Sequence, residues 1–63
     1  MSSKYVVVVP YDDENEGIHL NEGEVLTLLR ILRADFEVWA ITNETGAIPL
    51  TAFRFCCRPV NGS

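Results

Sequence analysis

The segment IHLNEGEVLTLLRIL, residues 18–32, decides which fold class the sequence predicts. Its first three residues, Ile18 to Leu20, alternate apolar and polar side chains, as a half-buried β-strand does. The next four residues, Asn21 to Glu24, have the composition of a turn, in which Gly23 supplies a positive φ angle. The segment therefore begins with a strand and a turn, which lead into the longest apolar run of the chain.

That apolar run, Val25 to Leu32, is compatible with two kinds of secondary structure. Its leucines have good helix propensity. However, no residue before it fits well as a helix N-cap, strand signals lie on both sides, and eight residues is a normal length for a buried strand. We predict a central strand whose alternate residues line the core, followed by a connector at Arg33 to Asp35.

Further strands are predicted on both sides of this segment, because short runs rich in β-branched and aromatic residues end at turn residues. They cover Tyr5–Val9, Phe36–Thr42, Gly46–Pro49 and Phe53–Cys57. Short strands with turns between them predict an all-β fold, a small five-stranded barrel. The domain is expected to span residues 4–58, with flexible termini at 1–3 and 59–63.

The connections between these strands are predicted from their polar residues. Tyr11–Gly17 is expected to be an exposed acidic loop, since its charged side chains cannot enter a core. Asn43-Glu44 is expected to form a tight hairpin turn. Leu50–Ala52 is expected to be a brief link before the last strand.

Length and charge limit the classes of function. The chain has 63 residues, of which 48% are hydrophobic, enough for one small domain with a single core. Nine acidic residues against five scattered basic residues leave a net charge of −4. Nucleic acid binding draws most of its affinity from Lys and Arg, so no nucleic acid partner is predicted. An acidic surface suits a basic protein segment better.

The two cysteines, Cys56 and Cys57, are adjacent in the sequence. Neighbouring residues of a strand point to opposite faces, so one thiol is expected inside and one outside. A disulfide between them would need strained backbone geometry. Free thiols, with no signal peptide pattern and no membrane-spanning apolar run, predict a cytoplasmic protein without a membrane partner.

The sequence offers no set of residues for catalysis. Its single histidine, His19, lies between two apolar strand positions and is expected to face solvent. Nucleophilic catalysis needs a nucleophile, a base and an orienting group, and adjacent thiols do not match the spacing of zinc ligands. We therefore predict no catalytic residues, no metal, no cofactor and no small-molecule substrate; the chain is not expected to be an enzyme.

The order of these segments resembles that of an SH3 domain. Val9–Asp13 stands where the family has its Ala-Leu-Tyr-Asp-Tyr motif, and Ile18–Glu24 matches its step from alternating residues into a Gly-Glu turn. Val25–Leu29 matches its strand rich in leucine and valine, and Gly46–Pro49 resembles its Gly-Tyr-Ile-Pro signature. The resemblance covers Tyr5–Cys57, and a final strand one turn after the signature is expected from it.

The resemblance implies a protein–protein interaction module. SH3 domains bind proline-rich peptides in the polyproline II conformation, across a groove of aromatic side chains. It implies that this chain binds a proline-rich or basic segment of a partner protein, as one domain of a larger adaptor or signalling protein. Two alternatives remain, a barrel of the Tudor or KOW type and a structural docking domain.

The aromatic groove is expected to be incomplete. Tyr11 matches the first tyrosine of the opening motif, but Asp13 replaces the second. Ala47 and Ala52 stand where the family usually has aromatic residues, whereas Pro49 is retained. Simple proline-rich peptides are therefore expected to bind weakly.

Two alignments remain open for the groove tryptophan. An ungapped alignment back from Gly46 places Phe36 at that position with Asp35 beside it, and puts Trp39 on a core-facing position; we prefer this alignment. A shifted alignment with a shortened hairpin would instead place Trp39 in the groove. A methyl-lysine cage of the Tudor type would need three or four aromatic residues, and Tyr11, Phe36 and Trp39 are the only candidates outside the terminal strands.

The predicted binding surface combines apolar side chains with acidic ones that would select Arg or Lys in a ligand. Its members are Tyr11, Asp12, Asp13, Glu16, Asp35, Phe36, Trp39 and Pro49.

Overall fold

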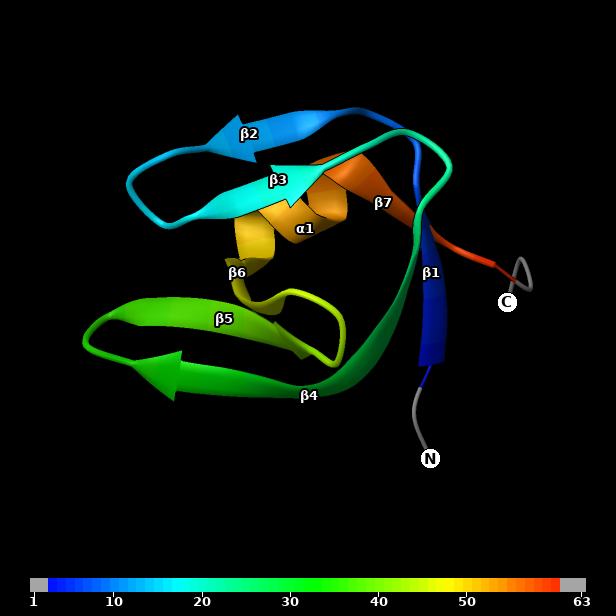
Figure 1. Ribbon diagram of the computed structural model, residues 1–63. Coiled ribbons are helices and arrows are strands. Elements are labelled where there is room, and N and C mark those ends of the chain that lie inside the picture. Colours follow the sequence, from blue (N-terminus) through cyan, green and yellow to red (C-terminus); the bar gives the residue numbers. More distant parts are fainter. Residues whose placement is uncertain (1–2, 61–63) are drawn as a thin grey trace.

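The computed structural model describes residues 3–60, which form seven β-strands and one short α-helix (Figure 1). The elements in chain order are β1 (Ser3–Val7), β2 (Tyr11–Asp13), β3 (Ile18–Leu20), β4 (Val25–Ala34), β5 (Glu37–Thr42), β6 (Gly46–Pro49), α1 (Leu50–Cys56) and β7 (Cys57–Pro59). Ser3 and Pro59 are therefore paired strand residues one position outside the predicted domain. Residues 1–2 and 61–63, part of the termini predicted to be flexible, lie outside the described residues.

The strands form two antiparallel sheets. Five of them pair in the order β6-β5-β4-β1-β7, and β2 pairs only with β3. Strands make up 59% of the described residues and helix 12%, so the all-β class is confirmed. The predicted five-stranded barrel is not closed, because β6 and β7 are the two edges of the larger sheet and no ladder joins them within residues 3–60.

Strand β4 is the central strand of the larger sheet, as predicted, but only its first half enters the core. Leu26 and Thr27 are buried, whereas Leu29, Ile31 and Leu32 are exposed. The first half pairs with β1 and the second half with β5, and the ladder is irregular between Leu28 and Arg30. The second half of β4 thus extends beyond the end of β1 and pairs only with β5. The strand also continues through the predicted connector as far as Ala34.

Helix α1 corrects the prediction for the C-terminal region. Phe53–Cys57 was expected to be a strand and Leu50–Ala52 a link, but Leu50–Cys56 is helical and the last strand begins at Cys57. Phe53 and Cys56 are both buried, and a spacing of three residues places them on one face of a helix. This pairing of apolar residues, together with Pro49 before the helix, favours helix over strand.

The core lies between the larger sheet, α1 and the β2–β3 hairpin (Figure 1). Its nine buried apolar residues come from every element except β2: Val7, Ile18, Leu20, Leu26, Ala40, Ile48, Phe53, Cys56 and Cys57. Both thiols are buried, so the expectation of one inward and one outward cysteine is wrong. The alternation rule fails because the chain passes from helix to strand between them.

The β5–β6 hairpin is fastened to β4 through Thr27. The turn contains three residues, Asn43 to Thr45, rather than the predicted two, because Thr42 pairs with Gly46. Both oxygens of the Glu44 carboxylate accept hydrogen bonds from Thr27, one from its N–H at 2.7 Å and one from its hydroxyl at 2.8 Å. The N–H of Asn43 donates to the Thr27 carbonyl at 3.0 Å, and the Lys4 ammonium donates to the Thr27 hydroxyl at 2.9 Å. These bonds join β1, β4 and the hairpin at one residue.

The stability of the domain should depend on the ionisation of Glu44. The N–H and hydroxyl of Thr27 hold the pKa of this carboxyl below its ordinary value of 4.5. A depressed pKa in the folded state means that the stabilisation is complete above pH 4.5 and is lost as the pH falls through the folded pKa. We expect Glu44→Gln to lower the melting temperature at pH 7, and the difference from wild type to shrink at pH 3.

Thermal melts followed by circular dichroism at both pH values would measure this. Glu14→Gln removes the same charge from an exposed side chain that makes no hydrogen bond within the described residues, and should follow wild type. An equal difference between Glu44→Gln and wild type at pH 3 and pH 7 would show that the charge of Glu44 does not act through Thr27.

Candidate functional site

The pairing of β5 with β6 places Trp39 directly opposite Pro49. One residue further along the ladder, Ala40 faces Ile48, and both of these are fully buried. Successive side chains of a strand point to opposite faces, so Trp39 and Pro49 share the outer face, where both are half-buried. Trp39 therefore does not take the core-facing position that our preferred alignment gave it.

Phe36 lies at the tip of the β4–β5 hairpin, not within a strand. Ala34 pairs with Glu37, which leaves Asp35 and Phe36 as a two-residue turn. Both have positive φ angles, 50° and 69°, as a type I′ hairpin turn requires. A phenylalanine in this region is strained, and its side chain is fully exposed. The ring makes no compensating contribution to the core, so it is available to a ligand.

An open depression of about 470 Å³ connects this hairpin tip to the start of α1. We call it the Phe36–Pro49 depression; its lining residues are Phe36, Glu37, Val38, Pro49, Leu50 and Thr51. Two predicted site residues, Phe36 and Pro49, thus border one hollow, and the ladder sets Trp39 beside Pro49. Leu50 and Thr51 carry no sequence signal as site residues, because their part in the site depends on helix α1.

Tyr11 and Asp13 lie on β2, and their side chains interact with each other. The Tyr11 hydroxyl donates to Asp13 Oδ2 at 3.4 Å. Burial, and then the charge of Asp13, raise the pKa of Tyr11 above its ordinary value, so the phenol stays neutral. Asp13 Oδ1 accepts the backbone N–H groups of Asn15 and Glu16 at 3.1 and 3.3 Å. Asp13 thus holds the turn and orients Tyr11, a structural role that leaves its carboxylate less available to a ligand.

The other acidic residues of the predicted surface, and Glu37, lie on two hairpins. Asp12 and Glu16 are exposed on the β2–β3 hairpin, and Asp35 and Glu37 are exposed at the tip of the β4–β5 hairpin. Asp12 faces His19, which is exposed as predicted, at 3.5 Å. In Figure 1 the two hairpins extend in the same direction, with α1 and β6 between them. Each hairpin therefore carries exposed negative charge, and Asp35 and Glu37 belong to the same β4–β5 hairpin as Trp39.

The thiols do not form a reactive centre. Burial raises the pKa of Cys56, and burial together with the neighbouring Cys56 raises the pKa of Cys57 to about 11. Because the thiolate is the nucleophile and the metal ligand, these cysteines are poorly suited to either role. Within residues 3–60 no three His, Cys, Asp or Glu side chains gather as a metal site would require.

No stretch of the described chain forms a helix with the length and apolar character that crossing a membrane would require. Comparison of the sequence and structure with models of protein families, with curated proteins and with solved structures finds no match.

Strain at Phe36 leads to a stability prediction. Phe36→Gly should raise the melting temperature by about 4–8 °C, the equivalent of about 1 kcal/mol, because glycine adopts a positive φ freely and no buried surface is lost. Phe36→Ala, the matched control, removes the ring but keeps the Cβ atom and should change the melting temperature by less than half as much. A lower melting temperature for Phe36→Gly would show that the ring stabilises the fold.

Proposed function

We propose that this chain is an SH3-like protein-interaction domain, which binds a proline-rich and basic segment of a partner protein. The single observation that carries the proposal is the pairing of Trp39 with Pro49 on the outer face of the β5–β6 ladder. A half-buried tryptophan beside a rigid proline is the kind of surface on which the proline rings of a ligand can stack.

The order of the elements supports the same proposal. The chain runs from an opening strand through an acidic hairpin into three consecutive antiparallel strands, β4, β5 and β6, the last of which ends at Pro49. A helical segment and a short final strand follow, and β7 pairs with the opening strand. This is the order of secondary-structure elements that the resemblance to SH3 domains implies. One difference is that the seven-residue helix α1 lies between β6 and β7, where only one short turn was expected.

The apolar part of the surface suits an extended ligand. A polyproline II segment has no internal hydrogen bonds and is already stiff before binding, so flat rings can hold it at low entropic cost. Trp39 and Pro49 provide one such position, and Tyr11 is a second aromatic residue on the adjoining hairpin. The Phe36–Pro49 depression shares Pro49 with this position and reaches the strained tip at Phe36, although Trp39 does not line it. Aromatic residues at such positions are frequent binding hot spots.

The acidic side chains of the surface favour a ligand with positive charge. Acidic side chains on both hairpin tips attract Lys or Arg at the ends of a bound segment. Because these side chains are exposed, each pair contributes little on its own and salt screens it. The charges should therefore act mainly on the association rate and the orientation of the ligand.

The missing aromatic residues set the expected affinity. Asp13 is engaged with Tyr11 and its own turn, and Ala47 and Ala52 provide no ring. With essentially one complete stacking position, a short proline-rich peptide should bind with a dissociation constant near 1 mM, or about −4 kcal/mol. A physiological partner would add contacts in the Phe36–Pro49 depression.

The proposal predicts how variants change peptide binding. The probe is a ten-residue peptide with a Pro-x-x-Pro core and arginines at one end, titrated into the ¹⁵N-labelled chain and followed by NMR and by fluorescence of the single tryptophan. Trp39→Ala should weaken binding about tenfold or more, and Phe36→Gly should weaken it severalfold although it stabilises the fold. Phe55→Ala is the matched control, since Phe55 is an exposed phenylalanine outside the site.

The probe also separates the alternatives. Raising the salt concentration, or replacing the arginines with glutamates, should weaken binding. Tighter binding of a trimethyl-lysine peptide than of the proline-rich probe would favour a Tudor-type function instead. Binding that is unchanged in both Trp39→Ala and Phe36→Gly would place the ligand on another face and overturn the proposal.

A further inference from the structure

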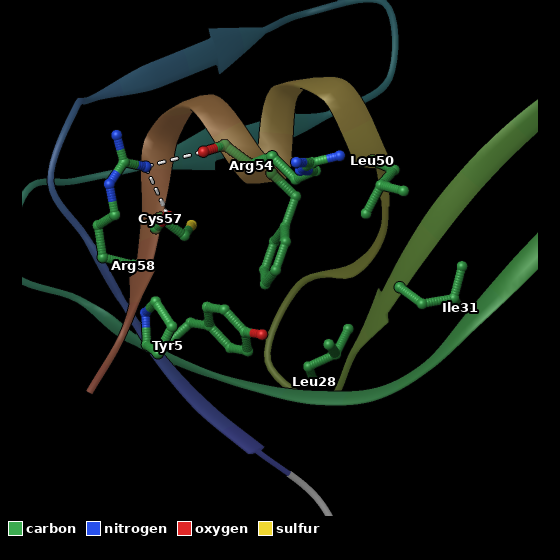
Figure 2. Close-up of a pocket in the computed structure, with 9 residues that line it drawn as sticks. Tyr5, Leu28, Ile31, Leu50, Arg54, Cys57 and Arg58 are labelled. Atoms are coloured by element: carbon green, nitrogen blue, oxygen red, sulfur yellow. Dashed lines mark hydrogen bonds between the residues drawn. The ribbon is translucent and has the colours of Figure 1, made fainter. Parts of the chain in front are cut away.

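A second hollow lies between α1 and the strands β1, β4 and β7 (Figure 2). Its volume is about 450 Å³, within the range of ligand pockets in proteins. We call it the Tyr5–Phe53 pocket; its lining residues are Tyr5, Leu28, Ile31, Leu50, Phe53, Arg54, Cys57, Arg58 and Pro59. Leu50 is the only lining residue that it shares with the Phe36–Pro49 depression. Two distinct hollows therefore adjoin at the start of α1.

The wall of this pocket is apolar and well defined. The rings of Tyr5 and Phe53 contact each other at a centroid distance of 4.8 Å and an angle of 59°, which fixes one side. Leu28 and Ile31 form the floor on β4, and Figure 2 shows the Tyr5 hydroxyl directed into the space between them and α1. That hydroxyl makes no hydrogen bond within residues 3–60. The pocket thus offers an apolar surface with one free polar group inside it.

The charge at the rim has the opposite sign to that of the whole protein. The chain carries a net charge of −4, yet the pocket lining holds two arginines and no acidic residue. Within the described residues neither arginine has a carboxylate oxygen within 4 Å of its guanidinium nitrogens; the one close contact of a basic with an acidic side chain joins His19 to Asp12. Arg58 Nη1 donates to the carbonyls of Arg54 and Cys57 at 2.8 and 2.9 Å, which anchors its guanidinium at the rim (Figure 2).

We propose that the Tyr5–Phe53 pocket is a second docking site, which receives an acidic segment of a partner protein. One large apolar side chain of that segment fills the space over Leu28 and Ile31, and flanking carboxylates pair with Arg54 and Arg58. Guanidinium groups match carboxylates in geometry as well as charge. Leu29 and Val60, which follow the lining residues Leu28 and Pro59 in the sequence, are also exposed and apolar, which suits an extended segment better than a compact small molecule. The inference is independent of the proposed function.

The test uses two short peptides and the ¹⁵N-labelled 63-residue chain. The probe is acetyl-Asp-Glu-Phe-Asp-Glu-amide, and the charge-reversed peptide is acetyl-Lys-Gln-Phe-Gln-Lys-amide. The acidic probe should give saturable NMR shifts at the amides of Leu28, Ile31 and Phe53, and the basic peptide should not. Arg54→Gln should weaken binding about two- to fivefold, as expected for one exposed charge pair; Arg33→Gln, at the β4–β5 tip, should not.

A second pair of variants tests the apolar contact. Ile31→Ser should weaken binding of the acidic probe, whereas Leu32→Ser should leave it unchanged. The two residues are adjacent and similarly exposed, at 47% and 40%, but Leu32 pairs with Trp39 and lies on the other face of β4. Phe36→Gly should also leave this binding unchanged, which separates it from the proline-rich site.

Several results would overturn the inference. One is that the basic peptide binds as tightly as the acidic probe, and another is that neither Arg54→Gln nor Ile31→Ser weakens binding of the acidic probe. A third is that 3-phenylpropionate binds as tightly as the acidic probe, which would identify a small apolar acid as the ligand. Shifts at the pocket that depend on protein concentration without any peptide would identify a second copy of the chain as its occupant.

Discussion

The bonds between Glu44 and Thr27 fix the part of the structure on which the candidate site depends. One carboxylate, carried by a three-residue turn, accepts two hydrogen bonds from a single residue of the central strand. This contact holds the β5–β6 hairpin against β4 where the β4 ladder is about to change partners. With the turn held there, Thr42 pairs with Gly46, and each later pair of the ladder follows, as far as Trp39 and Pro49. The position of the one tryptophan is thus set by a contact at the far end of its hairpin.

The change of partners along β4 also explains the two hollows that adjoin at the start of α1. The half of β4 that pairs with β1 contributes Leu26 to the core, while the half that pairs with β5 extends beyond it. Helix α1 covers part of the resulting space and divides it at Leu50. Glu37 lines one hollow, next to the Asp35–Phe36 turn, whereas Arg54 and Arg58 line the other. The protein therefore presents surfaces of opposite charge on either side of a single helix, and each suits a different kind of segment.

The sequence could predict those features that depend on local pattern. Alternation identified the strand at Ile18 to Leu20, and Gly23 has the positive φ angle expected of its turn. Helix α1 was missed because in seven residues a spacing of three and an alternation of two are hard to distinguish. The role of Asp13 could not be foreseen either, since it depends on how close the hairpin brings it to Tyr11. The choice between Phe36 and Trp39 as the residue opposite Pro49 depends on the length of the β5–β6 turn, which the amino-acid composition does not determine.

Cross-strand nuclear Overhauser effects measure directly the register that sets Trp39 opposite Pro49. Directly opposed residues of an antiparallel pair have Cβ atoms about 4.5–5.5 Å apart. The structure predicts backbone contacts between Ala40 and Ile48, and contacts of the Trp39 indole with the Pro49 ring. Backbone contacts between Glu37 and Ile48, with Phe36 opposite Pro49, would establish the register shifted by three residues and contradict the account.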